Sequence, residues 1–270
     1  MQEEKNHSTQ AGEADVLYHY CSTEAFRSII ESGNIRLSAL DFSNDALEGE
    51  LLWQRIAQGL RQRGVPGDAI QSMEKEAART LYFWVGYGFC LSTKGDNLGQ
   101  WRGYADDGHG FSIGFSKSAL EALIEKNPFP INGQQGKAAL ERVRYVEDAD
   151  DAIEATLVAI ARLHGDAPAL GNLLAHISRQ RYLYKPSGFT EEHEWRILVA
   201  PRAQDLHQLH FRATRSRLVP FLELPFSQAD PIVSITAGPK QLTPDAVIQG
   251  FLKKHGVASA AVRRSACSYR

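Results

Sequence analysis

The sequence of 270 residues has few cysteines: Cys21, Cys90 and Cys267 lie far apart, and none belongs to a CxxC pair. An odd number of scattered cysteines, with no secretory leader in this sequence, is typical of a reduced cytoplasmic protein. Cysteine and histidine do not cluster, so no metal site is predicted. No apolar run approaches the roughly 20 residues that a membrane span needs. We therefore expect a cytoplasmic protein without membrane contact.

Three common catalytic or phosphate-binding motifs are also missing. The chain contains no GxxxxGK(S/T), no HExxH and no GxSxG. The glycines of the pairs Gly86 with Gly88 and Gly108 with Gly110 do not open a helix after a strand, as the dinucleotide-binding fingerprint requires. These absences argue against a P-loop nucleotide site, a zinc protease and an α/β-hydrolase.

The composition is that of a globular protein. Apolar residues make up 43% of the chain, charged residues make up 23%, and the formal net charge is −2. A chain of this length buries about three quarters of the surface that it exposes when unfolded. Residues 1–15 are polar and lack periodicity, which predicts a disordered tail. No clear linker follows, so we predict a single domain over residues 16–270.

The near-neutral total hides an uneven distribution of charge. Residues 1–60 hold 4 basic and 10 acidic side chains, whereas residues 195–270 hold 11 basic and 4 acidic ones. A basic segment of this kind can bind a polyanion such as nucleic acid or a phosphorylated ligand. No dense basic run is present, so solvated surface charges are the simpler interpretation.

Hydrophobic periodicity predicts both helices and strands. Helices are predicted from Ser22 or Thr23 to Gly33, at residues 46–63 and 68–82, from Ser116, through residues 150–183 with a break near Pro168, and from Thr243, with Pro244 at the first position, to Gly256. Strands are predicted at residues 16–21, 35–38, 88–92, 111–115, 140–146, 194–200, 206–214, 217–224, 232–237 and 258–264. Because the two do not alternate regularly, we predict an α+β fold with a mixed, mostly antiparallel, curved or split sheet flanked by helices. Strands after residue 194 are expected to pair with strands before residue 116.

Two predicted helix starts carry polar side chains. Tyr18, His19 and Tyr20 lie on the first strand, with His19 on the face opposite to the two tyrosines, and Ser22 follows at the start of the helix. Free N–H groups at such an end bind an anion or ribose hydroxyls. Asn44 precedes the next helix, where capping is the favoured role. For His19 taken alone, a hydrogen-bonded core histidine is an equally good interpretation.

A segment rich in polar and aromatic residues joins two apolar strands. Ser92 ends the first strand, and Trp101, Arg102 and Tyr104 follow in a predicted loop. Loops of this kind are often binding surfaces. The aromatic side chains would stack on a planar ring, or they would only anchor the loop, and the sequence favours neither.

A further cluster lies around residue 190. Lys185 precedes Glu192, Glu194 and Arg196. If the chain is extended from Glu192 onward, both carboxylates and the guanidinium point to one face. A surface ion pair and a catalytic site are both open interpretations of this pattern. The chain ends with an aromatic residue and the cation Arg270.

Taken in order, these motifs resemble the prokaryotic protein family known as domain of unknown function 2971. The motifs of this sequence that carry the resemblance are LYHY at 17–20, IRLS at 35–38, Asn44 and Asp45 with Glu48, FCLS at 89–92, Trp101 with Tyr104 and Gly110, Lys185, Glu192 with residues 194–196, and Ser265 with Tyr269 and Arg270. The resemblance spans residues 16–270. No single motif is specific, and the resemblance depends on their order.

A second resemblance implies a chemistry. The first strand with His19, the strand that ends at Ser92 and a later glutamate are similar to the three-part site of the ADP-ribosyltransferase superfamily. In that superfamily a histidine or arginine holds the ribose of NAD, a serine-rich strand or a tyrosine shapes the nicotinamide pocket, and a glutamate orients the attack. The resemblance implies a similar core, NAD as the substrate, and three catalytic candidates: Glu194 first, Glu192 second, and His19 as the ribose ligand.

The same resemblance implies a set of NAD-binding residues. Tyr104 or Tyr20 would stack on nicotinamide, and Arg102 or Arg196 would meet the pyrophosphate. The implied set is Tyr18, His19, Tyr20, Ser22, Asn44, Ser92, Trp101, Arg102, Tyr104, Lys185, Arg196 and Arg270.

Other functions stay open at this point. A non-catalytic sensor would bind a nucleotide in the same pocket and leave NAD intact. A nucleic-acid-acting effector of phage defence or of a toxin system, a setting in which members of the family often occur, would use the basic segment, and its binding would weaken steeply with salt. The acceptor, a protein or a nucleic acid, and the oligomeric state do not follow from the sequence.

Overall fold

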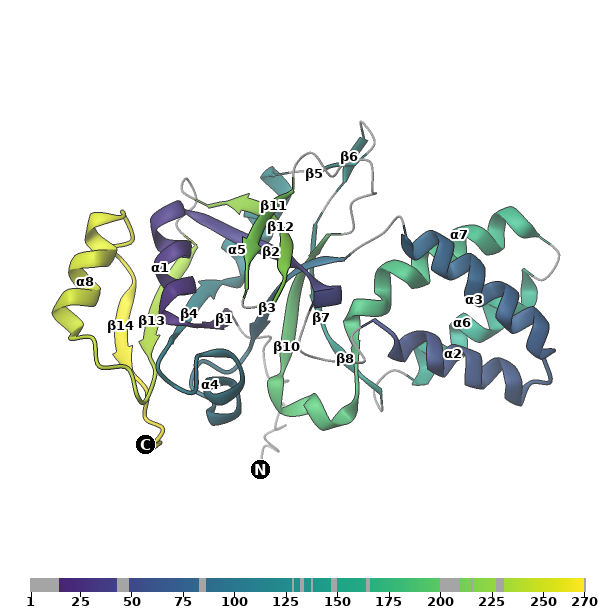
Figure 1. The fold of residues 1–270 in the computed structure, drawn as a ribbon, viewed down its shortest axis with the longest axis horizontal. Coiled ribbons are helices and arrows are strands. Elements are labelled where there is room, and N and C mark those ends of the chain that lie inside the picture. Colours follow the sequence, from purple (N-terminus) through teal and green to yellow (C-terminus); the bar gives the residue numbers. More distant parts are fainter. Residues whose placement is uncertain are drawn as a thin grey trace, which may run out of the picture.

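A computed structural model describes residues 15–42, 49–82, 86–127, 129–131, 134–136, 138–146, 150–163, 166–199, 209–214, 216–226 and 231–269. Its centre is a sheet in which strands pair in the order β11, β12, β2, β3, β1, β4, β13 and β14, with β10 joined to β3 and β7 joined to β10 (Figure 1). The strands are β1 (Val16–Cys21), β2 (Asn34–Ala39), β3 (Tyr87–Ser92), β4 (Phe111–Ser116), β7 (Ala139–Arg142), β10 (Glu194–Val199), β11 (His210–Ala213), β12 (Leu218–Pro225), β13 (Ile232–Ala237) and β14 (Ala261–Arg264).

The pairing confirms the predicted fold class. Among the described strands of this sheet, only β13 and β14 are parallel neighbours, and the other pairs are antiparallel. Late strands pair with early ones, as predicted: β10 with β3, β12 with β2, and β13 with β4. The fold is therefore α+β with a mixed, mostly antiparallel sheet. The predicted tail lies outside the described residues except for Asp15.

The sheet splits at β3. Along one edge, β3 pairs over its full length with β10. Along the other edge, Ser92 pairs with Tyr18 of β1, whereas Tyr87 pairs with Ala39 of β2. β1 and β2 therefore diverge, and residues 89–91 of β3 face the gap between them. We call this gap the fork.

The register of the pairs defines two faces of the sheet, because side chains alternate along a strand and directly paired residues share a face. One face is apolar and packs against α1 (Thr23–Ser32), α5 (Lys117–Lys126) and α8 (Asp245–Lys254) in one hydrophobic core. Buried side chains of this face include Leu17, Ile35, Leu37, Phe89 and Ile113. The opposite face is polar near the fork and carries Tyr18, Tyr20, Arg36, Ser38, Cys90, Glu194 and Arg196.

Helix α1 begins and ends where the sequence predicts. The Ser22 hydroxyl accepts a hydrogen bond from the N–H of Ala25 at 3.2 Å, and Gly33 ends the helix in the left-handed region at φ 63°. Phe26 and Ile29 lie on its buried face. A capped amphipathic helix of this kind depends on contacts only a few residues apart, which is why its bounds were predictable.

A second group of helices lies beside the sheet. It consists of α2 (Leu51–Gln62), α3 (Gly67–Tyr82), α6 (Asp150–Arg162) and α7 (Ala167–Gln180), which gather at one side of the molecule (Figure 1). They enclose a second hydrophobic cluster, with Ile56, Leu60 and Ile70 at its centre. Tyr182 of the short helix η3 (Arg181–Leu183) also belongs to this cluster.

The predicted loop around residue 100 is wrong, because it contains helix α4 (Leu98–Tyr104). The Asn97 side chain caps the helix by accepting a hydrogen bond from the N–H of Gln100 at 3.2 Å. The helix is short and buries little besides Trp101 and Gln100. It therefore lacks the long apolar periodicity by which helices are predicted.

The predicted strand at residues 140–146 is also wrong in part. β7 ends at Arg142, and the N–H of Val143 donates to the carbonyl oxygen of Glu194 at 2.9 Å. The chain then leaves the main sheet, and β8 (Arg144–Tyr145) pairs in parallel with β9 (Tyr184–Lys185). An alternating pattern does not show where a strand changes its partner.

Smaller corrections concern element ends. Gly49 adopts a left-handed φ of 79°, so α2 begins at Leu51, while residues 46–48 lie outside the described part of the chain. Pro244 is the cap of α8 and not its first residue. Residues 258–260 form a turn ahead of β14, and a small hairpin of β5 (Phe129–Ile131) and β6 (Gln134–Gly136) has no predicted counterpart.

Among the described residues, the helices are too short or too polar to cross a membrane.

Candidate functional site

A cavity of about 450 Å³ opens at the fork. Its walls come from the polar face of β1, β2, β3 and β10, from α4 and from the short helix η4 (Ser187–Glu192), and His19, Phe89 and α1 line it from the other face of the sheet. Because the fork leaves a gap in the sheet, Ser22 and Ser28 at the other face reach the same cavity. Its size is within the range of small-molecule sites. The fork therefore provides a cavity where distant segments of the chain meet.

His19 lies at the fork. Its Nδ1 atom is 2.8 Å from the carbonyl oxygen of Cys90, and its ring stacks on Phe89 with centroids 4.0 Å apart. Burial lowers the pKa of the imidazole to about 4, and the hydrogen bond with Cys90 opposes this only in part. A carbonyl oxygen can only accept, so Nδ1 carries the proton and Nε2 is an acceptor at neutral pH. His19 can thus accept a hydrogen bond from a ligand hydroxyl.

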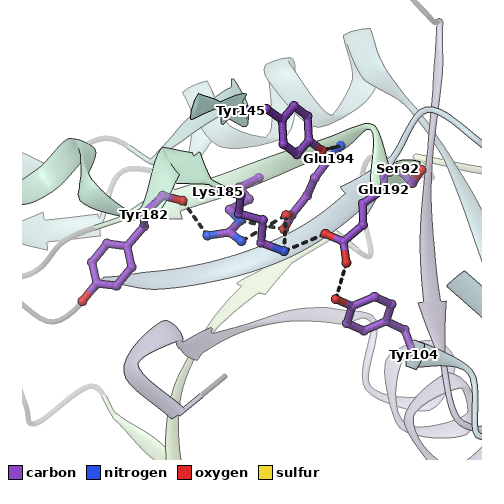
Figure 2. Close-up of polar contacts among 8 residues, drawn as sticks. Ser92, Tyr104, Tyr145, Tyr182, Lys185, Glu192 and Glu194 are labelled. Atoms are coloured by element: carbon purple, nitrogen blue, oxygen red, sulfur yellow. Dashed lines mark hydrogen bonds and ion pairs between the residues drawn. The ribbon is translucent and has the colours of Figure 1, made fainter. Parts of the chain in front are cut away.

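Four buried charged residues, which we call the ionic network, lie together beside the fork (Figure 2). Lys185 Nζ is 2.6 Å from Glu192 Oε2 and 2.8 Å from Glu194 Oε2. Arg196 binds both carboxylate oxygens of Glu194, through Nε at 2.6 Å and Nη2 at 3.0 Å. Two cations and two carboxylates balance one another, which is how charges are tolerated at this depth.

Glu194 and Lys185 stay charged within the network. Burial would raise the pKa of Glu194, but Arg196 and Lys185 outweigh burial and hold that pKa at about 2. Burial would likewise lower the pKa of Lys185, yet the nearby carboxylates, Glu194 above all, raise it above its usual value. Both oxygens of Glu194 are occupied by cations, so this carboxylate acts first as a counter-ion.

Glu192 is the member of the network that also contacts Tyr104. The Tyr104 hydroxyl donates to Glu192 Oε1 at 2.5 Å, while Lys185 binds Oε2. Figure 2 shows the two partners approaching different oxygens of this carboxylate. Burial raises the pKa of Tyr104, so its hydroxyl keeps its proton. A carboxylate held in this way beside a cavity can stabilise positive charge or accept a proton.

A backbone turn brings Glu192 into the network, and the predicted extension from Glu192 onward is wrong. Glu192 ends η4, His193 has a left-handed φ of 46°, and β10 begins only at Glu194. The Ser92 hydroxyl donates to the carbonyl oxygen of Glu192 at 2.6 Å, which holds the turn against β3. The two carboxylates reach the same lysine through this turn and not by sharing a strand face.

Helix α4 is held in place by its own aromatic contacts. The Tyr20 hydroxyl donates to the carbonyl oxygen of Lys94 at 2.8 Å and accepts from the N–H of Asn97 at 2.9 Å. Trp101 is fully buried, and its Nε1 donates to Asp96 Oδ1 at 2.7 Å. These contacts fix the segment that carries Tyr104 at the cavity.

The segment from α4 to β10 supplies most of the polar side chains just described, and the family comparison matches this part of the chain. Residues 100–197 match the family described as "Protein of unknown function (DUF2971)". The matched segment contains Tyr104 and the whole ionic network, whereas His19 precedes it. The match to DUF2971 supports the predicted resemblance over this segment, and beyond it the resemblance stays a prediction. No curated protein and no solved structure matches the chain.

The cavity brings together most of the residues predicted for the site, within the DUF2971 segment and outside it. Those that line it are Tyr18, His19, Tyr20, Ser22, Tyr104, Lys185, Glu192, Glu194 and Arg196.

Other predicted residues lie elsewhere. Ser92 and Trp101 are buried and hold the surrounding segments, so Trp101 offers no ring face to a ligand. Arg102 is exposed on α4, with its guanidinium 5.9 Å from the ring centre of Tyr269 and away from the cavity. The remaining two predicted residues, Asn44 and Arg270, lie outside the described residues.

Two arginines absent from the predicted site also line the cavity: Arg36 of β2 and Arg212 of β11. Arg36 alternates with the buried Ile35 and Leu37, so the strand pattern already placed it on the face away from the core. No pattern in the sequence points to Arg212, which reaches the cavity only because β11 pairs with β12 and β12 with β2.

Proposed function

We propose that the cavity binds NAD and that the protein transfers the ADP-ribose group to an acceptor on a protein or a nucleic acid. The observation that supports this most is the meeting of His19, Tyr104 and Glu192 at one cavity in the fork. They offer a neutral hydrogen-bond acceptor, an aromatic ring and a carboxylate. A ribose joined to a positively charged nicotinamide ring is bound by groups of these kinds.

The proposed transfer breaks the bond between ribose C1′ and the nicotinamide nitrogen. The bonding electron pair leaves with nicotinamide, which becomes neutral, and positive charge develops on the ribose. As in glycoside hydrolysis, a carboxylate beside the ribose stabilises that charge. An acceptor hydroxyl then forms a bond to C1′, and its proton passes to the carboxylate or to solvent.

Each of the three side chains has a role in this proposal. His19 accepts a hydrogen bond from a ribose hydroxyl through Nε2. Tyr104 is 43% exposed and Tyr20 only 5%, so Tyr104 is the residue that stacks on nicotinamide. Glu192 is the carboxylate beside the Tyr104 ring, because the Tyr104 hydroxyl donates a hydrogen bond to it. We assign the catalytic role to Glu192 ahead of Glu194, because cations bind both oxygens of Glu194, whereas Oε1 of Glu192 accepts only from the neutral Tyr104 hydroxyl.

A nucleotide-binding module without turnover is the second candidate. The closed ionic network favours it, because each carboxylate already has a cation partner and the four charges sum to zero. Such a module would bind NAD saturably and leave it intact. A role as an effector in defence or in a toxin system stays a prediction for either candidate.

The test is nicotinamide release from NAD by the full-length protein with mixed protein and RNA acceptors, followed by chromatography, with mass addition to acceptors measured in parallel. Glu192→Gln should lower the release about 100-fold or more, which is typical of losing one transition-state contact. Its melting temperature should fall, because the variant breaks the buried pair between Lys185 and Glu192 and leaves the network with one unbalanced positive charge, so release is compared at a temperature where both proteins are folded.

Glu191→Gln is the matched control, since Glu191 is the exposed neighbour in sequence, and this variant should keep its activity. Saturable binding of NAD in calorimetry without nicotinamide release would replace the transferase by the binding module. An absence of NAD binding would reject both candidates.

A further inference from the structure

We propose that Arg36 and Arg212 form a phosphate subsite of the cavity, which takes the diphosphate of a nucleotide. This rests on the proposed function, since the nucleotide is the one whose ribose meets His19. The two arginines come from the arm of the sheet made of β2, β12 and β11, across β3 from the ionic network. They are the guanidiniums of the cavity that lie outside that network.

Strand register places both arginines on one face of this arm. Arg36 pairs with Glu223, and Arg212 pairs with Val219, two residues of β12 that alternate onto the same face. Phe221 lies between them on that face, and the Arg36 guanidinium carbon is 4.9 Å from its ring centre. This contact with the ring uses none of the N–H donors of the guanidinium, so it does not compete with a ligand for them.

Arg36 has a buried donor without a partner. Its Nε atom has no hydrogen bond within the part of the chain that the structure describes. Glu223 Oε1 is 3.9 Å away, which is within ion-pair range but beyond a hydrogen bond. A buried N–H without an acceptor is destabilising, and a small shift of the Arg36 side chain, which is partly exposed, would bring this donor to an anion bound in the cavity.

The two guanidiniums repel each other. Burial and the charge of Arg36 both lower the pKa of Arg212, so the two groups are close enough to interact. Within the described residues, Glu223 forms an ion pair with Arg36 and no carboxylate forms one with Arg212, so the charge of Arg212 is not balanced there. A phosphate that bridges the two guanidiniums would relieve the repulsion and accept several hydrogen bonds at once.

Ser38 completes the local chemistry. It pairs with Phe221 across β2 and β12, and it lines the cavity on the same face as Arg36. A hydroxyl on the same face can donate to a phosphate oxygen that the arginines leave free. In this proposal the two ends of the nucleotide lie on opposite sides of β3, with the nicotinamide ribose at Glu192 and the diphosphate at the arginines.

The experiment measures the binding of ADP-ribose and of adenosine to the full-length protein by calorimetry at one ionic strength. Arg36→Gln and Arg212→Gln should each weaken ADP-ribose about 10- to 100-fold, the usual effect of losing a charged hydrogen bond, and leave adenosine unchanged. Arg263→Gln is the matched control, because it removes the same charge from the exposed strand β14, and it should leave both affinities unchanged.

The subsite would be overturned if wild type and both variants bound ADP-ribose with equal affinity. It would also be overturned if the wild-type protein failed to bind ADP-ribose, or if it bound adenosine as tightly as ADP-ribose. These outcomes are distinct from failure of the proposed function. ADP-ribose is a product and needs no turnover, so a loss of affinity in the variants supports the subsite even if nicotinamide is never released. Nicotinamide release with unchanged ADP-ribose affinity in both variants would keep the transferase and reject the subsite.

Discussion

The two sides of the cavity use arginine in opposite ways. On the β10 side, Arg196 is 1% exposed and binds Glu194 with two nitrogens, inside a network whose charges sum to zero. On the β2 side, Arg36 forms an ion pair with Glu223 at 3.9 Å, and Arg212 forms none with the residues that the structure describes. The first side is complete without a ligand, whereas the second is left with unmet donors. Burial and pairing, and not residue type, therefore distinguish an arginine whose donors are used within the protein from one that keeps a donor without a partner.

The largest expected effect comes from breaking the β10 side. Glu194→Gln leaves Arg196 without its bidentate partner and Lys185 with Glu192 alone, and breaking a buried pair of this kind costs about 3–5 kcal/mol of unfolding free energy. Urea denaturation of wild type and variant at pH 7 measures it. A loss below 1 kcal/mol would show that the ionic network contributes little, and the contrast between the two sides would fail.

An intermediate effect is expected from acid. The folded-state pKa of His19 is about 4, below the usual 6.5 of the unfolded chain, so the unfolded state takes up a proton first as the pH falls. Stability from this residue is fully present above pH 6.5 and declines toward pH 4, with a slope of at most about 1.4 kcal/mol per pH unit. Denaturation curves between pH 7 and pH 4.5 should show this slope in wild type and a shallower one in His19→Gln. Equal slopes would mean that His19 titrates normally.

A smaller effect on stability is expected at Tyr104, which lines the cavity and is hydrogen-bonded to Glu192. Tyr104→Phe removes the donor to Glu192 Oε1 but keeps the ring, and Tyr104 is partly exposed, so about 1 kcal/mol or less should be lost. If Tyr104 only stacks on nicotinamide, NAD affinity is unchanged. If its hydroxyl also orients the Glu192 carboxylate, nicotinamide release falls while the affinity for NAD is unchanged. Calorimetry and release assays on the same sample separate the two, and a fall in affinity alone would contradict both.

The smallest effect is expected on the β2 side. Arg212→Gln should change the free energy of unfolding by no more than about 0.5 kcal/mol, because an exposed side chain without a packing role contributes little. Thermal and urea denaturation check this without a ligand. A loss comparable to that of Glu194→Gln would mean that Arg212 is structural, and the difference between the two sides would disappear.

Local patterns predicted the elements around the site better than the site itself. The strand at residues 16–21, the cap at Ser22 and the stop at Gly33 were all predictable, because each depends on neighbours within one turn or one alternation. Helix α4 was not, since a helix of seven residues has too little periodicity to separate it from a loop. The left-handed turn at His193 was not either, because a non-glycine residue seldom adopts it and only the hydrogen bond from Ser92 reveals what supports it.

The sequence by itself determined which side chains are available: a histidine between two tyrosines, a lysine ahead of two glutamates and an arginine, and a strand that alternates Arg36 with apolar residues. It also determined most of the helices and strands that carry them. Only the tertiary structure decided which of these side chains meet, because β3 pairs with β1 at one end and with β2 at the other and so opens the fork. It also decided that Glu194 neutralises Arg196, whereas Arg212 has no ion pair within the described part of the chain. Pairing and burial depend on contacts between distant segments, and no local pattern records them.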